Sequence, residues 1–466
     1  MELRFTTIQL SYIVAMTLFF VGLKDLGSPA TARKGNTLAS VGMLIAIVAT
    51  LLEKQVLNYG MIFIAIALGS LLGAVMAYKV EMTDMPQMVG LLNGFGGAAS
   101  AMVAVGEFWR YLAIVQNPPL STTITALLGV LIGGVTFTGS VMAFAKLQGL
   151  ITGSPIVFPA QKILNGLLLG GFLIGSIYIC LHPFNSGIFL GLLFISLILG
   201  VTFVLPIGGG DMPVVISLLN SFSGLAGSAA GFVVNNNLLI IAGALVGASG
   251  IILTVIMCKA MNRSLANVLF AGFGSGESAG GAASGGTVEG TVKSIDTEEG
   301  AMMLGYARSV VIVPGYGMAV AQAQHSVKEL ADALESLGVE VKYAIHPVAG
   351  RMPGHMNVLL AEANVPYPQL YDMDDINPMF EQTDVALVIG ANDVVNPAAK
   401  DDKNSPIYGM PILEVDRAKH TIVIKRGMST GFAGVENDLF YKDKTMMLFG
   451  SAKDMVAKLA SDVKQL

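Results

Sequence analysis

The chain has 466 residues, of which 53% are hydrophobic and only 13% are charged. This composition is too apolar for a soluble protein of that length, and the net charge of −5 gives no reason to expect nucleic acid as a partner. The apolar excess lies before residue 260. We therefore expect a membrane domain at 1–260, a linker at 261–290, in which Gly272–Gly290 is rich in Gly, Ser and Ala, and a soluble domain at 291–466.

The first domain contains about nine apolar stretches that can cross a bilayer as helices, which need roughly 20 apolar residues each. The stretches are Ile8–Leu23, Thr37–Leu52, Tyr59–Tyr78, Met85–Val105, Ile124–Phe144, Ile163–Cys180, Gly187–Leu205, Met212–Val234 and Leu238–Cys258.

Basic residues between these stretches predict the orientation, because Lys and Arg concentrate in cytoplasmic loops. With the N-terminus outside, the residues inside are Lys24, Arg33, Lys34, Lys79, Lys146, Lys162, Lys259 and Arg263, and those outside are Arg4, Lys54 and Arg110. This imbalance favours an outer N-terminus. An odd number of spans then brings the soluble domain to the cytosol.

Polar residues within the spans are candidates for an ion or proton path, because each costs free energy in lipid. Asn93 and Asn220 lie within spans, and Asp211 opens one. An equally good interpretation is that the asparagines hydrogen-bond between helices and that Asp211 caps a helix at the interface. Cys180 and Cys258 lie in apolar runs and predict neither a disulfide nor a metal site.

A strand, a glycine-rich turn and a helix open the soluble domain. Val310–Val313 is typical of a buried strand, and apolar residues recur at helical spacing over Met318–Leu337. The turn contains Gly315 and Gly317, and Val320 occupies the position that is usually Gly or Ala. This Gly-x-Gly-x-x-Val pattern indicates a dinucleotide site, where a pyrophosphate approaches the turn and the helix N-terminus. The alternative is a tight turn in another kind of α/β domain.

Strands and helices alternate through the rest of the domain. Further strands are expected at Val339–Ile345, Asp384–Ile389, Pro411–Val415, Thr421–Lys425 and Thr445–Phe449, and helices at Met356–Ala363 and Ala452–Leu459. This alternation predicts a Rossmann-like, doubly wound parallel sheet with ligands at the carboxyl ends of its strands. The loops at those ends, His346–His355, Gly390–Pro397 and Lys425–Gly434, hold the Gly, Asn, Asp and Arg residues that binding needs.

The charges in these loops favour NADP(H). The second strand is followed by His346, without the carboxylate that an NAD site usually places there for the ribose 2′-hydroxyl. Lys425 and Arg426 are two cations suited to a 2′-phosphate, and Arg351 is another phosphate candidate. Lys425 and Arg426 could instead form a solvated strand end. Asp393 either hydrogen-bonds a ribose or carboxamide, or caps a turn.

Segments of both domains resemble the beta subunit of the proton-translocating NAD(P) transhydrogenases. The resemblance is carried by Val313–Gln324, His346–Ala363, Gly390–Pro397, Lys425-Arg426, Val135–Ser140, Gly210–Pro213 and Met257–Arg263. It implies an oxidoreductase and translocase, Re/Si-specific, in which this chain binds NADP(H) and a separate alpha subunit binds NAD(H). Hydride would pass from NADH to NADP+, coupled to proton entry into the cytosol.

The resemblance also implies site residues. Together with the three positions of the Gly-x-Gly-x-x-Val pattern, these residues give the full set of expected NADP(H) contacts. The set is Gly315, Tyr316, Gly317, Val320, Val348, Ala349, Gly350, Arg351, Met352, Pro353, Gly390, Ala391, Asn392, Asp393, Val394, Gly409, Met410, Lys425, Arg426, Gly427, Met428, Ser429, Thr430, Gly431 and Phe432. Asp211 and Asn220 correspond to positions tied to proton translocation. Many relatives carry His where this chain has Asn93, and Tyr where it has Phe432. Water near Asn93 or a group of the partner subunit would have to replace that His.

The resemblance further implies a dimer of alpha–beta units, surrounded by lipid in a bacterial-type inner membrane. A rival hypothesis is a nucleotide-gated ion channel or transporter, with the soluble domain as a dinucleotide sensor and no hydride transfer. It explains the membrane spans and the glycine turn equally well, but it explains the NADP-favouring cations less well. A third hypothesis is a structural membrane subunit with a degenerate nucleotide fold.

Overall fold

The computed structural model describes residues 2–52, 59–81, 84–114, 118–153, 155–208, 211–261, 264–269, 291–405, 407–431 and 433–466. The chain forms two compact units. The first comprises Met1–Thr152, Ile156–Pro206 and Ile216–Ile252, and the second comprises Gly153–Pro155, Ile207–Val215 and Leu253–Leu466. Most of the expected linker, 261–290, lies outside the described residues. The domain limits given above therefore remain a proposal.

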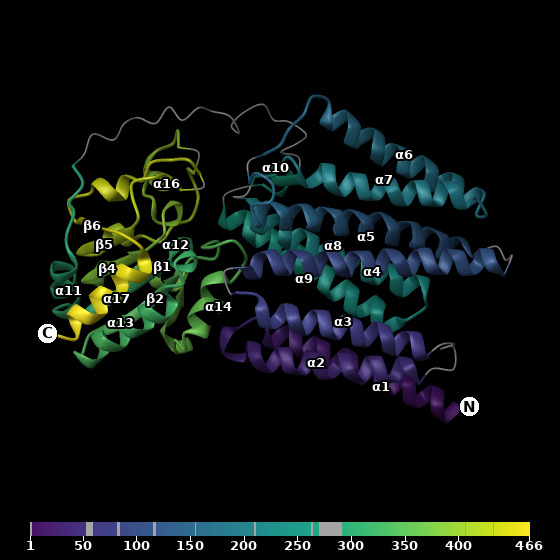
Figure 1. Ribbon diagram of the computed structural model, residues 1–466, viewed down its shortest axis with the longest axis horizontal. Helices are drawn as coiled ribbons and strands as arrows, with labels where there is room; N and C mark the ends of the chain where they lie inside the picture. The colour runs from purple at the N-terminus through teal and green to yellow at the C-terminus, as the bar shows by residue number, and fades with distance from the viewer. Residues whose placement is uncertain are drawn as a thin grey trace. The chain divides into compact units, whose positions relative to one another are not determined.

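Nine helices in the described part of the chain are long and apolar enough to cross a membrane. They are α1 (Glu2–Asp25), α2 (Pro29–Leu51), α3 (Tyr59–Lys79), α4 (Met85–Ala113), α5 (Leu120–Leu147), α6 (Gln161–Leu181), α7 (Ser186–Val204), α8 (Met212–Val233) and α9 (Asn237–Ala260) (Figure 1). Each contains one of the expected stretches in full or without its last residue, and a helix satisfies its own backbone hydrogen bonds in lipid. The predicted multi-pass membrane protein is confirmed.

Small residues bring several of these helices close together. A Cβ on Gly97 of α4 would lie 2.8 Å from the carbonyl oxygen of Gly133 of α5, and a Cβ on Gly224 of α8 would lie 2.9 Å from that of Gly243 of α9. Neither position accepts a larger side chain without moving a helix, as expected for tightly packed membrane helices.

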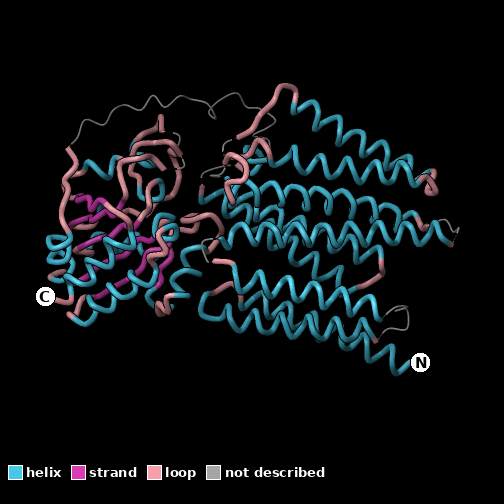
Figure 2. The backbone as a smooth tube through the Cα atoms, viewed as in Figure 1, coloured by secondary structure: helices cyan, strands magenta, loops and turns pink. Residues whose placement is uncertain are grey.

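The described strands all belong to one parallel sheet in the C-terminal part (Figure 2). They are β1 (Ser309–Pro314), β2 (Glu340–Ile345), β3 (Leu370–Asp372), β4 (Val385–Ile389), β5 (His420–Lys425) and β6 (Thr445–Phe449). Their order is β3-β2-β1-β4-β5-β6. This is the doubly wound order of dinucleotide-binding domains, which reverses between β1 and β4. The predicted Rossmann-like fold is confirmed.

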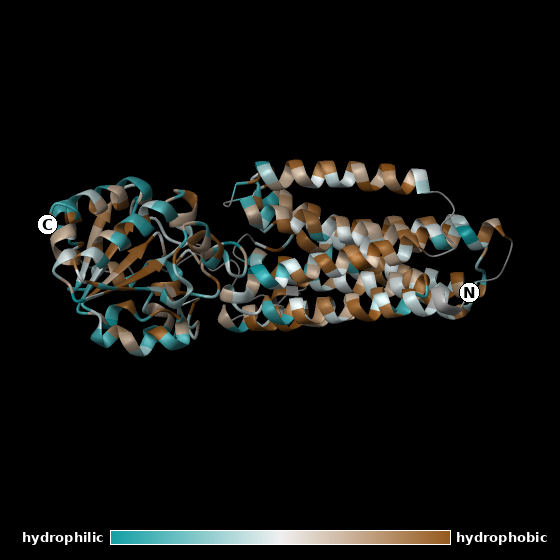
Figure 3. Ribbon diagram, turned by 90° about the horizontal axis from the view of Figure 1, so that it is seen from below, coloured by the Kyte–Doolittle hydropathy of each residue, from teal (hydrophilic) through white to brown (hydrophobic). Residues whose placement is uncertain are grey.

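Both faces of the sheet are buried, which explains its continuous runs of branched apolar residues. Val311, Ala386 and Val423 pack in one core cluster with Phe380 and Phe440, and further members from the same face are Val313, Val388, Leu413, Val415 and Leu439. The alternate strand residues point to the other face. There α11 (Thr297–Gly305), α13 (Gln324–Ser336) and α17 (Ala452–Val463) pack together, with polar residues outward (Figures 1 and 3).

Three details differ from the expectations. Pro411–Val415 is not a strand: Leu413 donates its N–H to the carbonyl of Val394 at 2.9 Å, and Val415 begins a 3₁₀ helix, η6 (Val415–Arg417). The short strand β3 was not expected. The helix expected over Met318–Leu337 is two helices, α12 (Tyr316–Val320) and α13, separated at Gln322, whose φ of 50° is left-handed.

Candidate functional site

The turns after β1 and β4 meet at the point where the strand order reverses. Gly315 donates its N–H to the carbonyl of Ile389 at 2.9 Å, and Gly317 donates to the carbonyl of Gly390, also at 2.9 Å. A Cβ on Gly317 would lie 2.7 Å from the Cα of Gly390, so the two turns touch only because both residues are glycine. The turn glycines therefore bring the two strand ends together, and both N–H groups are used within the protein.

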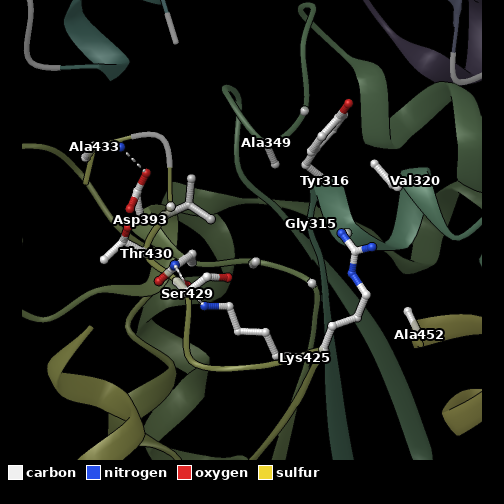
Figure 4. Close-up of a pocket in the computed structure, with 18 of the residues that line it drawn as sticks. Gly315, Tyr316, Val320, Ala349, Asp393, Lys425, Ser429, Thr430, Ala433 and Ala452 are labelled. Carbon is white, nitrogen blue, oxygen red and sulfur yellow. Dashed lines mark hydrogen bonds between the residues drawn. The ribbon is translucent and has the colours of Figure 1, made fainter. Parts of the chain in front are cut away.

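A pocket opens at this carboxyl edge of the sheet (Figure 4). Its lining in the sheet domain includes most of the expected contacts, namely Gly315, Tyr316, Gly317, Val320, Val348, Ala349, Gly350, Gly390, Ala391, Asn392, Asp393, Val394, Met410, Lys425, Arg426, Gly427, Ser429, Thr430 and Gly431. Arg351, Gly409 and Met428 are direct sequence neighbours of lining residues, and Met352 and Pro353 follow Arg351, but none of the five lines the pocket. Phe432 lies outside the described residues. The strand ends thus bring the expected segments together.

Several lining residues are not among the contacts expected from the sequence: Ala321, Ile407, Ile424, Ala433, Gly450, Ser451 and Ala452. Gly450, Ser451 and Ala452 directly follow β6. The rule that ligands bind at the carboxyl ends of parallel strands applies to this strand as well and could have found them. By contrast, Ile407 lies in a loop between distant elements, where the sequence carries no comparable signal.

One wall of the pocket is formed by the loops after β4 and β5. Lys425 extends toward Ser429 and donates to its carbonyl (Figure 4). Burial lowers the pKa of Lys425, and the nearby carboxylate of Asp393 opposes this shift. The Oδ2 of Asp393 accepts a hydrogen bond from the N–H of Ala433 at 3.0 Å. A Cβ on Gly431 would lie 2.6 Å from that oxygen, so a larger residue at position 431 would displace the carboxylate of Asp393.

The guanidinium of Arg351 lies over the aromatic ring of Tyr316, the first residue of α12. The guanidinium carbon of Arg351 lies 4.6 Å from the ring centroid of Tyr316. The backbone N–H of Arg351 donates to Nδ1 of His355 at 3.1 Å, and His355 is fully buried. The loop after β2 is therefore joined to the β1 turn through side chains.

A second buried histidine joins the loop after β2 to the segment before η6. Nδ1 of His346 accepts from the N–H of Val348 at 3.2 Å, so Nε2 carries the proton and donates to the carbonyl of Pro411 at 2.9 Å. Burial is the main cause that lowers the pKa of His346 to about 4. The ring is neutral at pH 7 and orders two pocket loops, a role the sequence did not reveal.

Of the three candidates for the proton path, Asn93 and Asn220 lie in the first unit, and Asp211 lies in the Ile207–Val215 segment of the second. Asn93 is buried in α4, and its Nδ2 donates to the carbonyl of Ile216 at 3.4 Å. Asn220 is half-buried in α8, and Asp211 lies in the turn immediately before that helix. The contact of Asn93 matches the interhelical interpretation. Among the described residues, no group of three His, Cys, Asp or Glu side chains could hold a metal ion.

The fold and the pocket define a multi-pass membrane protein with a Rossmann-like domain. A family model described as "NAD(P) transhydrogenase beta subunit" matches residues 8–462. Two curated relatives, one from Rhodospirillum rubrum and one from a named strain of that species, are called "NAD(P) transhydrogenase subunit beta". Each is 51% identical over 453 residues, which cover 96% of this chain and 97% of the relative. The chain belongs to the NAD(P) transhydrogenase beta subunit family.

Family membership confirms the resemblance seen in the sequence. It makes this chain a subunit of an oxidoreductase that uses NAD(P)(H), and a beta subunit implies an alpha subunit as partner. It favours the enzyme over the nucleotide-gated channel and over a structural subunit.

Proposed function

We propose that this chain binds NADP(H) in the pocket at the carboxyl edge of its sheet and that the alpha subunit binds NAD(H). The charge of the pocket carries the proposal. Lys425, the last residue of β5, and Arg426, which follows it, both line the pocket, whereas β2 ends at Ile345 without a carboxylate. Asp372 pairs beside Ile345 at the end of β3, but it is exposed and is not among the lining residues. Cations suit a 2′-phosphate, and a carboxylate would suit the free 2′-hydroxyl of NAD(H).

In this proposal different side chains have different roles in binding. Lys425 and Arg426 bind a negatively charged phosphate group of NADP(H), and Arg351 is a further candidate for binding a phosphate group. Because the N–H groups of Gly315 and Gly317 are used within the protein, side-chain cations carry this binding in place of the turn. The remaining expected contacts shape the pocket and exclude water. The cofactor itself supplies the hydride chemistry.

We further propose that NADH on the alpha subunit reduces NADP+ on this chain by direct, Re/Si-specific hydride transfer, coupled to proton entry into the cytosol. Asp211, Asn220 and Asn93 are the proposed groups of the proton path. An amide does not titrate near neutral pH, so water or a group of the alpha subunit serves beside Asn93. NADP+ and NADPH must favour different states of the protein, since a ligand shifts an equilibrium only by differential affinity.

The proposed topology follows from the charges between the spans. The N-terminus lies outside, residues 1–260 span a bacterial-type inner membrane, 261–290 link the two domains, and 291–466 bind NADP(H) in the cytosol. The active assembly is a dimer of alpha–beta units.

Nucleotide binding to the purified alpha–beta complex tests the cofactor assignment. NADPH and NADH are titrated separately, with a complex whose alpha subunit site is saturated by NAD+. We expect tight NADPH binding, weak NADH binding, and loss of most NADPH affinity in Lys425→Ala and Arg426→Ala. Arg417→Ala is the matched control, because Arg417 pairs with Glu381 and Glu414 away from the pocket. Equal affinity for NADPH and NADH, or wild-type affinity in Arg426→Ala, would contradict the assignment.

Coupling is tested in sealed vesicles that contain the same complex. We expect the rate of NADP+ reduction by NADH to rise when a proton gradient drives protons toward the side of the nucleotide domain. A rate that does not respond to the gradient would overturn the proposed coupling while leaving the cofactor assignment intact.

A further inference from the structure

Two buried asparagines behind the pocket wall form the same local turn. Asn396 follows β4 and Asn437 follows the loop after β5, and their exposed fractions are 0% and 2%. The Oδ1 of each accepts a hydrogen bond from the N–H two residues further on, Ala398 at 3.1 Å and Leu439 at 3.0 Å. This fixes the orientation of each amide, so that each Nδ2 is a donor directed away from its own turn.

Each amide then donates across to the segment that holds the other. Nδ2 of Asn396 donates to the carbonyl of Glu436 at 2.9 Å, and Nδ2 of Asn437 donates to the backbone carbonyl of Asn392 at 3.0 Å. The two bonds run in opposite directions between residues 392–396 and 436–437. They join the loops after β4 and β5 through two buried side chains, and a buried Nδ2 that loses its acceptor has no water to replace it.

The same two loops also touch within the pocket wall. The carboxamide of Asn392 lies 2.7 Å from the N–H nitrogen of Gly431 and 3.2 Å from Nζ of Lys425, and Asp393 accepts from Ala433. The contact of Asp393 is exposed. Water competes with an exposed contact, so it cannot by itself fix how the loops align. The bonds from Asn396 and Asn437 are part-buried and start from buried side chains, so water competes with them less.

We propose that Asn396 and Asn437 are positioning residues that set how long NADP(H) stays bound. This rests on the proposed assignment of NADP(H) to this pocket. Neither side chain is among the lining residues. Asn437 acts through Asn392 and Asn396 acts through Glu436, and together they hold the wall that carries Asp393 and Lys425.

Isosteric Asn→Asp substitutions test this. In Asn437→Asp and Asn396→Asp a carboxylate still accepts the local N–H but cannot donate across to the other loop. In the alpha–beta complex, stopped-flow fluorescence measures NADPH dissociation, and steady-state kinetics measure KM for NADPH and for the NAD-site substrate. We expect NADPH to dissociate about tenfold faster, the size of effect for one buried hydrogen bond. KM for NADPH rises accordingly, while KM at the alpha subunit is unchanged.

Asn377→Asp is the matched control. Asn377 also donates and accepts through its amide, to the carbonyl of Ile412 at 3.0 Å and from the N–H of Glu414 at 3.1 Å, but neither bond reaches residues 392–396 or 436–437. It is expected to lower the melting temperature without accelerating NADPH dissociation.

The outcomes separate this proposal from the cofactor assignment. If the wild-type complex does not retain NADPH, the assignment itself fails. If the wild type retains NADPH but Asn437→Asp and Asn396→Asp release it at the wild-type rate, or no faster than Asn377→Asp, the positioning role is wrong. If both variants fail to assemble while Asn377→Asp assembles, the paired amides support the fold itself and the proposal is overturned.

Discussion

The backbone N–H of Gly317 donates to the carbonyl of Gly390 across the point where the sheet reverses its order. These residues are 73 positions apart in the chain, and Gly390 has a φ of 64°, a conformation that favours glycine. The contact joins the ends of β1 and β4 without any intervening side chain. The pocket therefore begins at a backbone-to-backbone contact.

Gly317→Ala should destabilise the sheet domain and weaken NADPH binding. Its Cβ would lie 2.7 Å from the Cα of Gly390, so the two turns must separate. Overpacking of this kind costs about 1–3 kcal/mol. Thermal unfolding of the complex, followed by NADPH titration, measures both effects. Gly427→Ala is the control for stability, because its Cβ would meet no atom within 4 Å; equal melting temperatures for both variants would contradict the prediction.

Acid should destabilise the sheet domain through His346. Burial holds its pKa at about 4, below the ordinary value near 6.5, so the folded state binds fewer protons than the unfolded state between these values. The stability is fully present above about pH 6.5 and falls as the pH drops toward 4.

Replacing His346 with glutamine distinguishes the effect of its titration from the effect of its hydrogen bonds. His346→Gln keeps a donor for Pro411 but does not titrate, so we expect lower stability at pH 7 and a shallower loss between pH 6.5 and 4. Melting temperatures across this range measure both. A variant with the same acid slope as the wild type would show that His346 is not responsible.

Asp384→Asn should reduce stability without changing nucleotide affinity. Asp384 lies before β4, at the amino edge of the sheet, where its carboxylate pairs with Lys419 at 2.6 Å and accepts from the N–H of Arg308 at 2.8 Å. These partners, Lys419 first, lower the pKa of Asp384, so its stabilisation is lost as the pH falls through that lowered value. Loss of a charged hydrogen-bond acceptor costs about 1–2 kcal/mol. Unfolding and NADPH titration distinguish stability from binding, and a change in NADPH affinity would be unexpected.

Asn93→His should give proton coupling a new pH dependence. The substitution adds a group whose ordinary pKa is about 6.5 at a buried position of α4, where Asn93 now donates to the carbonyl of Ile216. The gradient-driven rate in sealed vesicles should acquire a transition between about pH 5.5 and 7.5 that the wild type lacks. Asn93→Gln is the control that keeps a neutral amide. Identical pH profiles for the His and Gln variants would exclude a role for this position in proton transfer.

Much of the fold was predictable because burial leaves a clear pattern. The branched apolar run Val310–Val313 marked β1, and long uncharged stretches marked the membrane helices. The same signal was misleading at Pro411–Val415, whose apolar side chains fill the core although its backbone bonds to a loop. It was absent at β3, which has three residues and is half-exposed. Helical spacing also continued across Gln322, where the backbone breaks the helix.

The sequence segments that line the pocket could be predicted, but the individual hydrogen bonds between them could not. Strand-end loops are recognisable because parallel strands deliver their carboxyl ends to one edge. The bond between His346 and Pro411 joins residues 65 positions apart, and that between Asn437 and Asn392 joins residues 45 apart. Nothing local marks such partners, since a polar residue in a loop has the same sequence appearance whether it is solvated or buried.

The strand order has a consequence for how the protein is made. β1 pairs with β4 in a register that places Val310 opposite Val385, and β4 then pairs with β5. Parallel pairings between such distant residues form slowly, because a long loop must close before any contact is gained. During synthesis β1 can pair with β2 first, and its pairing with β4 can form only after residues 385–389 emerge. The apolar helices described before β1 can by then enter the bilayer one after another. Membrane insertion should therefore precede formation of the pocket, and newly made chains should pass through a stage in which the membrane helices are inserted but the pocket has not yet formed.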